Sequence, residues 1–304
     1  MAKSQKAPQP VEPMSGKVLR KYLDTQDDFA LELDAYRLAR KFGFLANLGH
    51  LYDDVKTNKR RQNDVLASHE NKHRRIYLTI ECKSLDPTYP LLIQRIPRPV
   101  VESFHQIMQS QGSSINARAE SRVPQYWVGA ELLKLSGTNM YPSGDHVGKS
   151  MKRIKVTENG FAATDSEVYE KYTQALTSMN RVIQAGANAL RPKASPGWAL
   201  AFLPIVVVSN KSLWVADYDD GQLIADPSPA DEATFYLGWD YEIPTPLDPS
   251  HGATFTISHL HIMTQSRLPK FLRDIHDEDA LIWDALFGPK AEPDGIPSGY
   301  ARLD

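Results

Sequence analysis

Apolar residues recur at helical spacing in two long segments of the chain. Residues 26–44 begin with acidic side chains, which complement the dipole at the start of a helix, and they end near Gly43, a residue type common just past a helix. Residues 166–190 carry a continuous apolar stripe. The stripe comprises Val168, Tyr172, Ala175, Met179 and Val182. Both segments are therefore predicted to be amphipathic helices.

Shorter apolar or alternating runs, bounded by polar turns, are typical of β-strands. The predicted strands are residues 44–52, 62–69, 74–84, 198–210, 212–219, 234–241 and 254–264. A final helix is predicted at about 268–287, and the chain shows no internal repeat. Helices that alternate with strands indicate an α/β fold, in which helices flank a central mixed β-sheet.

The remaining segments define the domain organisation. Residues 85–160 are irregular: a short helix is predicted near 100–110, and the run at 125–135 fits a strand or a helix equally. We interpret 85–160 as an insertion within a single domain that spans 26–304. Residues 1–25 are expected to form a disordered tail, because their start is rich in Pro, Gln and Lys and lacks the apolar stretch of a secretory signal.

The composition narrows the class of protein. Of 304 residues, 41% are hydrophobic and 24% are charged, as in ordinary globular proteins. The longest apolar run, 198–208, is too short to cross a bilayer, so no membrane association is expected. A single cysteine excludes an internal disulfide and leads us to expect a reducing, cytoplasmic environment.

Charge is distributed unevenly along the chain. The net charge of −2 argues against a protein that coats nucleic acid by charge alone. Basic residues are nevertheless concentrated at 56–62 and 70–75. They are either the solvated turns of a hairpin or contacts to phosphate, and the pattern leaves both interpretations open.

Residues 79–84, with the sequence TIECKS, end one of the predicted strands. Side chains of a strand alternate between its two faces. One face therefore carries Ile76, Leu78, Ile80 and Cys82, and the other carries Tyr77, Thr79, Glu81 and Lys83. Cys82 is expected to be a small buried hydrophobic residue rather than a nucleophile.

Glu81 and Lys83 lie side by side on the polar face. A carboxylate can bind a hard divalent cation, and an ammonium can orient water or stabilise charge on a phosphate, so the pair suits metal-assisted phosphodiester hydrolysis. Such a site needs a second carboxylate, and Asp64 on the preceding strand is the candidate. The alternative is that Glu81 and Lys83 form only a cross-strand ion pair, because so short a motif arises often by chance.

The order of these elements resembles the PD-(D/E)XK nuclease superfamily, whose members have the restriction endonuclease-like fold. The resemblance covers about 26–84 and 166–218. It implies a divalent-metal-dependent nuclease that uses Mg²⁺ or Mn²⁺. The site residues it implies are Asp64 and Glu81 as metal ligands, Lys83 as the catalytic lysine, and Glu32 on the first helix to complete the site.

The chain departs from this superfamily in two ways. Asn63 precedes Asp64 where the pattern has proline, and a long separation divides Lys83 from the next core helix. That helix has a polar side, which carries Lys171, Gln174, Ser178 and Arg181. The resemblance suggests that Gln174 or Lys171 faces the metal-bound water or a phosphate, whereas the residue pattern favours a solvated face.

Three other motifs do not carry a function. GDHVGKS at 144–150 lacks the spacing of an ATP-binding phosphate loop, so a turn is expected there, with a loop that contacts the substrate backbone as the alternative. His259 and His261 have a spacing that can bind zinc, but no third ligand accompanies them, and we expect hydrogen-bonded strand histidines. The acidic residues at 217–220 are ordinary for a turn.

Two hypotheses of function follow from these observations. The first is a metal-dependent endonuclease that acts on nucleic acid, with DNA favoured over RNA. Fold analogy alone suggests a bacterial antiviral defence effector, restrained by oligomerisation or by a regulatory protein partner. The second is a non-catalytic module of the same fold, which binds nucleic acid or a partner and retains Glu81 and Lys83 as a structural pair.

Overall fold

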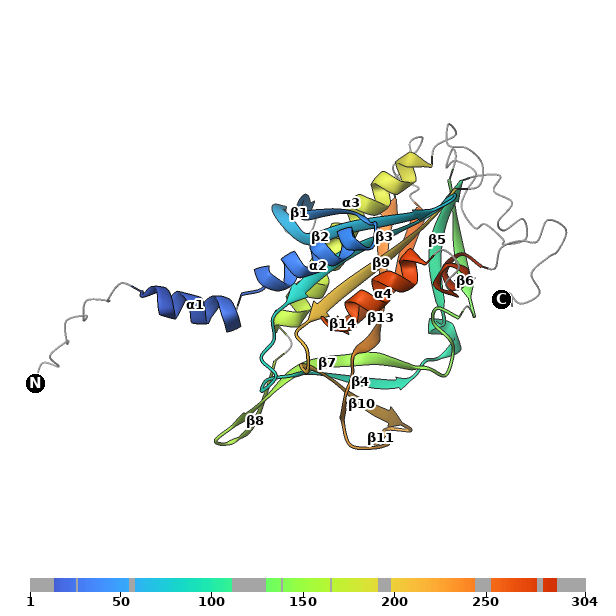
Figure 1. Cartoon of the computed structure of the whole chain (residues 1–304). Coiled ribbons are helices and arrows are strands. Elements are labelled where there is room, and N and C mark those ends of the chain that lie inside the picture. Colours follow the sequence, from blue (N-terminus) through green and yellow to red (C-terminus); the bar gives the residue numbers. More distant parts are fainter. Residues whose placement is uncertain are drawn as a thin grey trace, which may run out of the picture.

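The computed structural model describes residues 14–25, 27–54, 58–110, 130–137, 139–164, 166–190, 198–243, 253–277 and 281–288. Within them, fourteen strands form one large mixed sheet, flanked by helices (Figure 1). The path of hydrogen-bonded neighbours is β1-β2-β3-β9-β14-β13-β7-β4-β10-β11. The predicted α/β class with a central mixed sheet is therefore confirmed.

The helices are α1 (Gly16–Thr25), α2 (Phe29–Lys41), α3 (Ser166–Ala189), α4 (Leu268–His276) and α5 (Leu281–Phe287), with a 3-10 turn η1 at Val100–Glu102. The first eight strands are β1 (Leu45–Asp54), β2 (Lys59–Asn71), β3 (Arg74–Lys83), β4 (Leu91–Pro97), β5 (Phe104–Ser110), β6 (Ala130–Ser136), β7 (His146–Thr157) and β8 (Gly160–Thr164). The others are β9 (Ala199–Val208), β10 (Leu213–Asp219), β11 (Gln222–Leu223), β12 (Ser228–Pro229), β13 (Glu232–Ile243) and β14 (Ala253–Thr264).

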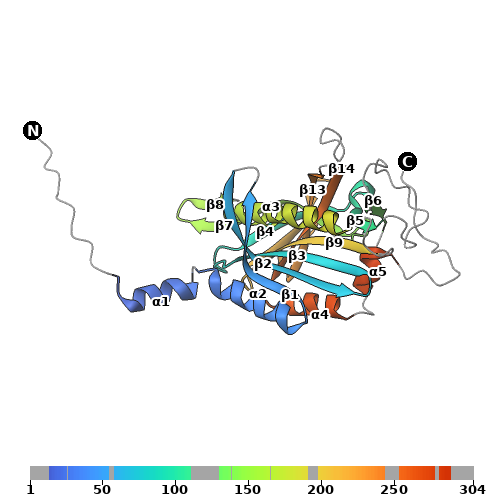
Figure 2. The ribbon, with the colours of Figure 1, turned by 90° about the horizontal axis from the view of Figure 1, so that it is seen from above.

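Strand β3, which carries Glu81 and Lys83, lies between β2 and β9 in the sheet. It is antiparallel to β2 and parallel to β9, every residue of which is buried. Helices α2, α4 and α5 cover one face of this region and α3 covers the other (Figure 2). The apolar side chains of β3, from Ile76 to Cys82, pack with α2 and α4, while Thr79 donates a hydrogen bond to the Ala175 carbonyl of α3 at 3.0 Å. The predicted alternation of the two faces is confirmed.

Several boundaries differ from the sequence prediction. Residues 268–287 form two helices, because the chain is extended at Asp277, directly after α4. The helix predicted near 100–110 is wrong: one 3-10 turn leads into β5, which pairs with β6 and β9. Within 125–135, the described residues from 130 onward form a strand.

The N-terminal prediction also needs correction at 16–25. These residues form helix α1, because apolar residues recur there at helical spacing, whereas the prediction of a disordered tail rested on the composition of the preceding residues. Residues 1–13 lie outside the described residues.

The segment 85–160 contributes to the main sheet. Strand β4 is parallel to β10, β5 is antiparallel to β9, and β7 is parallel to β13. These residues are thus joined to the core by backbone hydrogen bonds.

The far end of the β1–β2 hairpin leaves the sheet and leans against α3. The β2–β3 ladder stops at Val65 opposite Ile80, whereas β1 and β2 remain paired as far as Asp54 and Lys59. The hydroxyl of Tyr52 lies 3.1 Å from that of Thr177 on α3. This bend places the end of the β2–β3 ladder beneath α3 (Figure 2).

Candidate functional site

Asp64 and Glu81 come together where β2 parts from β3. Asp64 lies one residue beyond the ladder, and its Oδ2 accepts a hydrogen bond of 2.7 Å from the backbone amide of Cys82. The Asp64 carboxylate thus accepts a hydrogen bond from a backbone amide at the point where the ladder has stopped. Glu81 has no exposed surface, and its Oε1 accepts a hydrogen bond of 2.8 Å from Nδ2 of Asn63. Two carboxylates of neighbouring strands are therefore held in fixed orientations.

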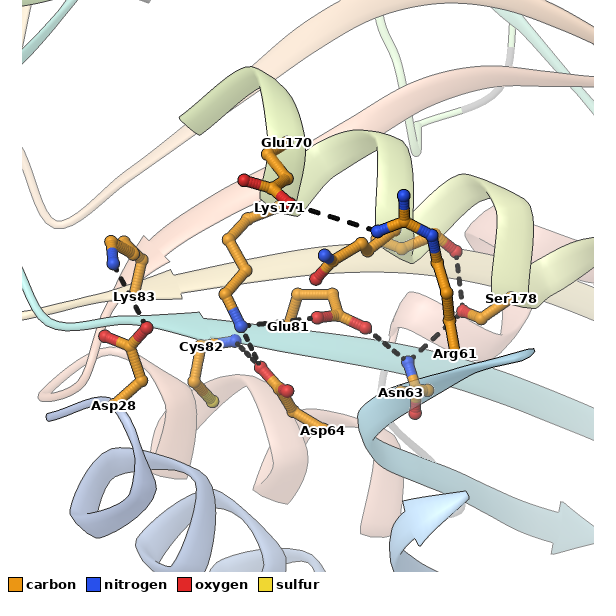
Figure 3. Close-up of polar contacts among 12 residues, drawn as sticks. Asp28, Arg61, Asn63, Asp64, Glu81, Cys82, Lys83, Glu170, Lys171 and Ser178 are labelled. Atoms are coloured by element: carbon orange, nitrogen blue, oxygen red, sulfur yellow. Dashed lines mark hydrogen bonds and ion pairs between the residues drawn. The ribbon is translucent and has the colours of Figure 1, made fainter. Parts of the chain in front are cut away.

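Lys171 of α3 lies between these two carboxylates (Figure 3). Its ammonium is 2.9 Å from Oδ2 of Asp64 and 3.6 Å from Oε2 of Glu81. Burial opposes the charged form, but the Asp64 and Glu81 carboxylates outweigh it and raise the pKa of Lys171 above its ordinary value. One cation position is therefore shared by the two acids, and a lysine fills it.

Glu81 is the most constrained carboxylate of the site. Burial, followed by the negative charge of Asp64, raises the pKa of Glu81 well above its ordinary value. Its Oε2 has no hydrogen-bond partner among the described residues, although Lys171 is near enough for an ion pair. A buried oxygen in this state is stabilised either by a proton or by a cation closer than the lysine.

Lys83 points away from the two carboxylates. Its ammonium pairs with Oδ2 of Asp28 at 3.2 Å, and Oδ1 of Asp28 accepts a hydrogen bond of 2.6 Å from the amide of Ser84. Asp28 directly precedes α2, so Lys83 joins the end of β3 to the start of that helix. Figure 3 shows this pair separate from the Lys171 contacts.

Glu32 lies in the first turn of α2 and is part of the same electrostatic environment. Partial burial, followed by the charge of Asp64, raises the pKa of Glu32 to about 7, while Lys171 acts in the opposite direction. Asp28 and Asp27 add further negative charge. Carboxylates therefore outnumber cations around Asp64.

The polar side of α3 covers the site. Lys171 of this side is partly buried. Ser178 is buried, and its hydroxyl oxygen accepts a hydrogen bond of 3.2 Å from Asn63. Gln174 contributes its backbone carbonyl, which accepts a bond of 3.5 Å from the Tyr52 hydroxyl. The interpretation of this side as a solvated face is wrong for Lys171 and Ser178, because the bent end of the β1–β2 hairpin lies against it.

Asn63, which stands in the place of the proline of the superfamily pattern, is also a site residue, although its sequence position did not predict this role. Its side chain links Glu81 on β3 to Ser178 on α3. No local pattern signalled this link, because Asn63 and Ser178 are 115 residues apart in the chain.

The donor set fits a divalent metal in part. Among the described residues, no group of three or more His, Cys, Asp or Glu side chains has the arrangement of a metal centre. Asp64 and Glu81 supply two carboxylates, and Mg²⁺ is commonly bound by one or two carboxylates, with water and substrate phosphate as its other ligands. The unpartnered Oε2 of Glu81 agrees with this chemistry.

The other motifs have structural roles. The turn expected at 144–150 is limited to residues 143–145; the rest of the motif lies in β7, where Lys149 forms an ion pair with Glu102. Nε2 of His259 accepts a hydrogen bond of 3.2 Å from Arg98, and Nε2 of His261 lies 2.8 Å from the Tyr141 hydroxyl. The prediction of hydrogen-bonded strand histidines is confirmed.

Two further expectations concern single residues. Cys82 is fully buried in the apolar core, and burial raises the pKa of its thiol well above the ordinary value, so the prediction that it is not a nucleophile is supported. Asp217 pairs with Arg95 at 2.7 Å and so takes part in a cross-strand ion pair.

Comparison with known proteins gave no match: no family model, no curated protein and no solved structure is similar to the chain. In the part of the chain that the structure describes, none of the helices is both long and apolar enough to span a membrane.

Proposed function

We propose that this protein is a divalent-metal-dependent nuclease with the restriction endonuclease-like fold of the PD-(D/E)XK superfamily. Its substrate would be the phosphodiester backbone of nucleic acid, with DNA favoured over RNA. The observation that carries the proposal is the convergence of Asp64 and Glu81, from neighbouring strands, on one cation position. The antiviral role and the restraint by oligomerisation or a protein partner belong to the same proposal, on fold analogy alone.

Asp64 and Glu81 would hold the metal, Mg²⁺ or Mn²⁺. When bound, such an ion polarises a phosphoryl oxygen and lowers the pKa of a bound water. The chain's own residues orient the two ligands: the Cys82 amide holds Asp64, and Asn63 holds one oxygen of Glu81. Glu32, close enough to respond to the charge of Asp64, would complete the negative environment.

The catalytic cation has two candidates. The superfamily resemblance assigns this role to Lys83, which in this structure is paired with Asp28. The geometry favours Lys171, because its ammonium lies next to both carboxylates. We therefore assign Lys171 to stabilise negative charge on the phosphate, and Lys83 to fix the end of β3 against α2.

A cleavage assay tests the proposal. The full chain is incubated with plasmid, linear duplex, single-stranded DNA and RNA, in Mg²⁺, in Mn²⁺ or in EDTA. Glu81→Gln keeps the side-chain shape and the oxygen that accepts from Asn63, whereas Glu70→Gln alters an exposed carboxylate on the same hairpin as a control. We expect cleavage by the parent and by Glu70→Gln, and none by Glu81→Gln. Absence of metal-dependent cleavage of every substrate would overturn the proposal.

One observation favours the alternative, a non-catalytic module of the same fold. Glu81 has no exposed surface and Lys171 already forms ion pairs with both carboxylates, which is how a structural ion cluster is built. Metal binding separates the two functions. A nuclease gains thermal stability from Mg²⁺ or Mn²⁺, since the ligand binds the folded state, whereas the module does not.

A further inference from the structure

A β-ribbon projects from the sheet beside the start of α3. Strand β7 pairs with β4 only as far as Arg153, and beyond that residue it pairs with β8 alone. The two strands turn at residues 158–159, and β8 is exposed along its length except at Thr164, which is partly exposed. Figure 1 shows this ribbon extending away from the body of the protein.

The end of the ribbon exposes apolar side chains beside basic ones. Val156 and Phe161 are direct cross-strand partners, and they are 72% and 80% exposed. Lys155 is exposed within the ribbon, Lys152 is exposed next to its base, where β7 still pairs with β4, and Glu158 is the acidic residue at the turn. An aromatic side chain this exposed contributes little to the fold, because folding removes little of its surface from water.

The ribbon is connected to the candidate site through α3. One residue separates β8 from α3, and Val168 in the first turn of α3 shares an apolar core with Met151 of β7. Lys171 follows in the next turn of that helix. The base of the ribbon therefore packs against the helix that carries the lysine between the two carboxylates.

A second basic hairpin end lies on the other side of the start of α3. Lys59 and Arg60 are exposed at the start of β2, and Arg61 lies 3.9 Å from Glu170 of α3. Both hairpin ends extend from the side of the molecule where α3 begins (Figures 1 and 2). Among their described exposed charges, basic residues outnumber acidic ones.

We propose that these two hairpin ends form the nucleic-acid-binding surface of the Asp64–Glu81 site, and that it takes a single-stranded segment. Lys59, Arg60, Lys152 and Lys155 would contact backbone phosphates on either side of the site. Phe161 would stack on an unpaired base. A base within a duplex has both faces covered by its neighbours, whereas a single strand offers one to an exposed ring. The inference rests on the proposed function only in taking nucleic acid as the ligand.

The test measures binding without cleavage. Fluorescence anisotropy of labelled single-stranded and duplex DNA is recorded in EDTA at several salt concentrations, with the full chain. We expect Lys152→Glu/Lys155→Glu to weaken single-strand binding about tenfold or more and to reduce the salt slope by about one unit or more. Phe161→Ala should weaken it about tenfold with little change of the slope, because stacking is not ionic.

A matched control reverses two exposed lysines on the opposite face of the sheet, in Lys41→Glu/Lys270→Glu on α2 and α4. This variant should bind within about twofold of the parent if the effect depends on location rather than on net charge. Equal losses in the control and the ribbon variant would overturn the proposal. So would duplex binding as tight as single-strand binding with no effect of Phe161→Ala, or a loss of self-association on Phe161→Ala, which would make a second copy the partner.

The proposed function and this inference fail separately. Ribbon-dependent binding without metal-dependent cleavage would remove the nuclease and keep the surface. Metal-dependent cleavage lost in Glu81→Gln, with binding unchanged in every ribbon variant, would keep the nuclease and remove the surface.

Discussion

The ammonium of Lys171 lies 2.9 Å from Oδ2 of Asp64, although 107 residues separate the two in the chain. This contact decides how the candidate site must behave, because it sets a cation from a helix against a carboxylate at the end of a strand. A divalent ion bound by Asp64 would have to displace that ammonium toward the phosphate that Lys171 is proposed to stabilise. Metal affinity, stability and the identity of the catalytic cation are thereby coupled.

Lys171→Met should make the metal-free protein less stable and its metal binding tighter. The substitution leaves Asp64 and Glu81 without their common cation, at a cost of about 3 kcal/mol in the free energy of unfolding. Mg²⁺ or Mn²⁺ should recover part of this loss, so the thermal shift on adding metal should exceed that of the parent. Lys149→Met, which breaks an ion pair on β7, is the control and should show no such metal effect. Unchanged stability of metal-free Lys171→Met would contradict the prediction.

Asp64→Asn and Glu81→Gln should each abolish metal-dependent cleavage with the fold intact. Both carboxylates would supply anionic oxygens to one cation, and neutral amides bind such an ion far less well. Titration calorimetry should show metal binding lost in both variants, and circular dichroism should show the parental fold. Parental metal affinity in both variants would remove the site from this position.

Lys171→Ala should slow cleavage about 100-fold, the scale seen when one positioned charge-stabilising group is lost. Lys83→Ala should slow it less than tenfold and cost about 1 kcal/mol or less, because its pair with Asp28 is partly exposed. Single-turnover rates at saturating metal compare the two variants. The reverse order would return the catalytic role to Lys83.

Acid should destabilise the protein through its buried histidines. Burial lowers the pKa of His105 and of His261 to about 4, in each case below the ordinary value of 6.5. The unfolded chain therefore takes up protons below pH 6.5 while the folded protein does not. The stability contributed by each neutral histidine is complete above about pH 6.5 and falls as the pH drops toward 4, by about 2 kcal/mol at pH 5.

Denaturant unfolding between pH 7 and pH 5 measures this effect. His105→Gln removes one titrating group and can still donate to the Leu286 carbonyl, so its loss of stability over this range should be about 2 kcal/mol smaller than that of the parent. His276→Gln, at an exposed position on α4, is the control and should follow the parent. An identical pH dependence for His105→Gln and the parent would show that His105 does not titrate in this way.

Local periodicity predicted most elements but not their partners. The helices at 26–44 and 166–190 appear as α2 and α3, and the alternation of β3 places Glu81 and Cys82 on opposite faces, since both patterns depend on neighbouring residues alone. The run at 104–110 is too short to distinguish a strand from a helix, and its pairing with β9 decided the matter. So short a pattern does not indicate whether a neighbouring strand is available to pair with it.

The sequence likewise predicted one part of the candidate site, the two carboxylates, and not the position of the lysine. Asp64 and Glu81 are joined by a hairpin, so their spacing in the chain was enough to suggest that they meet. The position of Lys171 depends on the bend of the β1–β2 hairpin toward α3, which follows from where the β2–β3 ladder stops. That bend comes from contacts among distant residues, and no pattern within α3 indicates it.

The parallel pairing of β3 with β9 bears on the order in which the molecule folds. The β2–β3 hairpin closes a short loop, whereas β9 joins β3 from more than a hundred residues away, with α3 in the connection between them. Pairings of high sequence separation form slowly, because the entropy of loop closure is lost before the contacts between the strands can compensate for it. Refolding should therefore bring Asp64 and Glu81 together first, and the arrival of Lys171 with α3 should coincide with the slow, rate-limiting step.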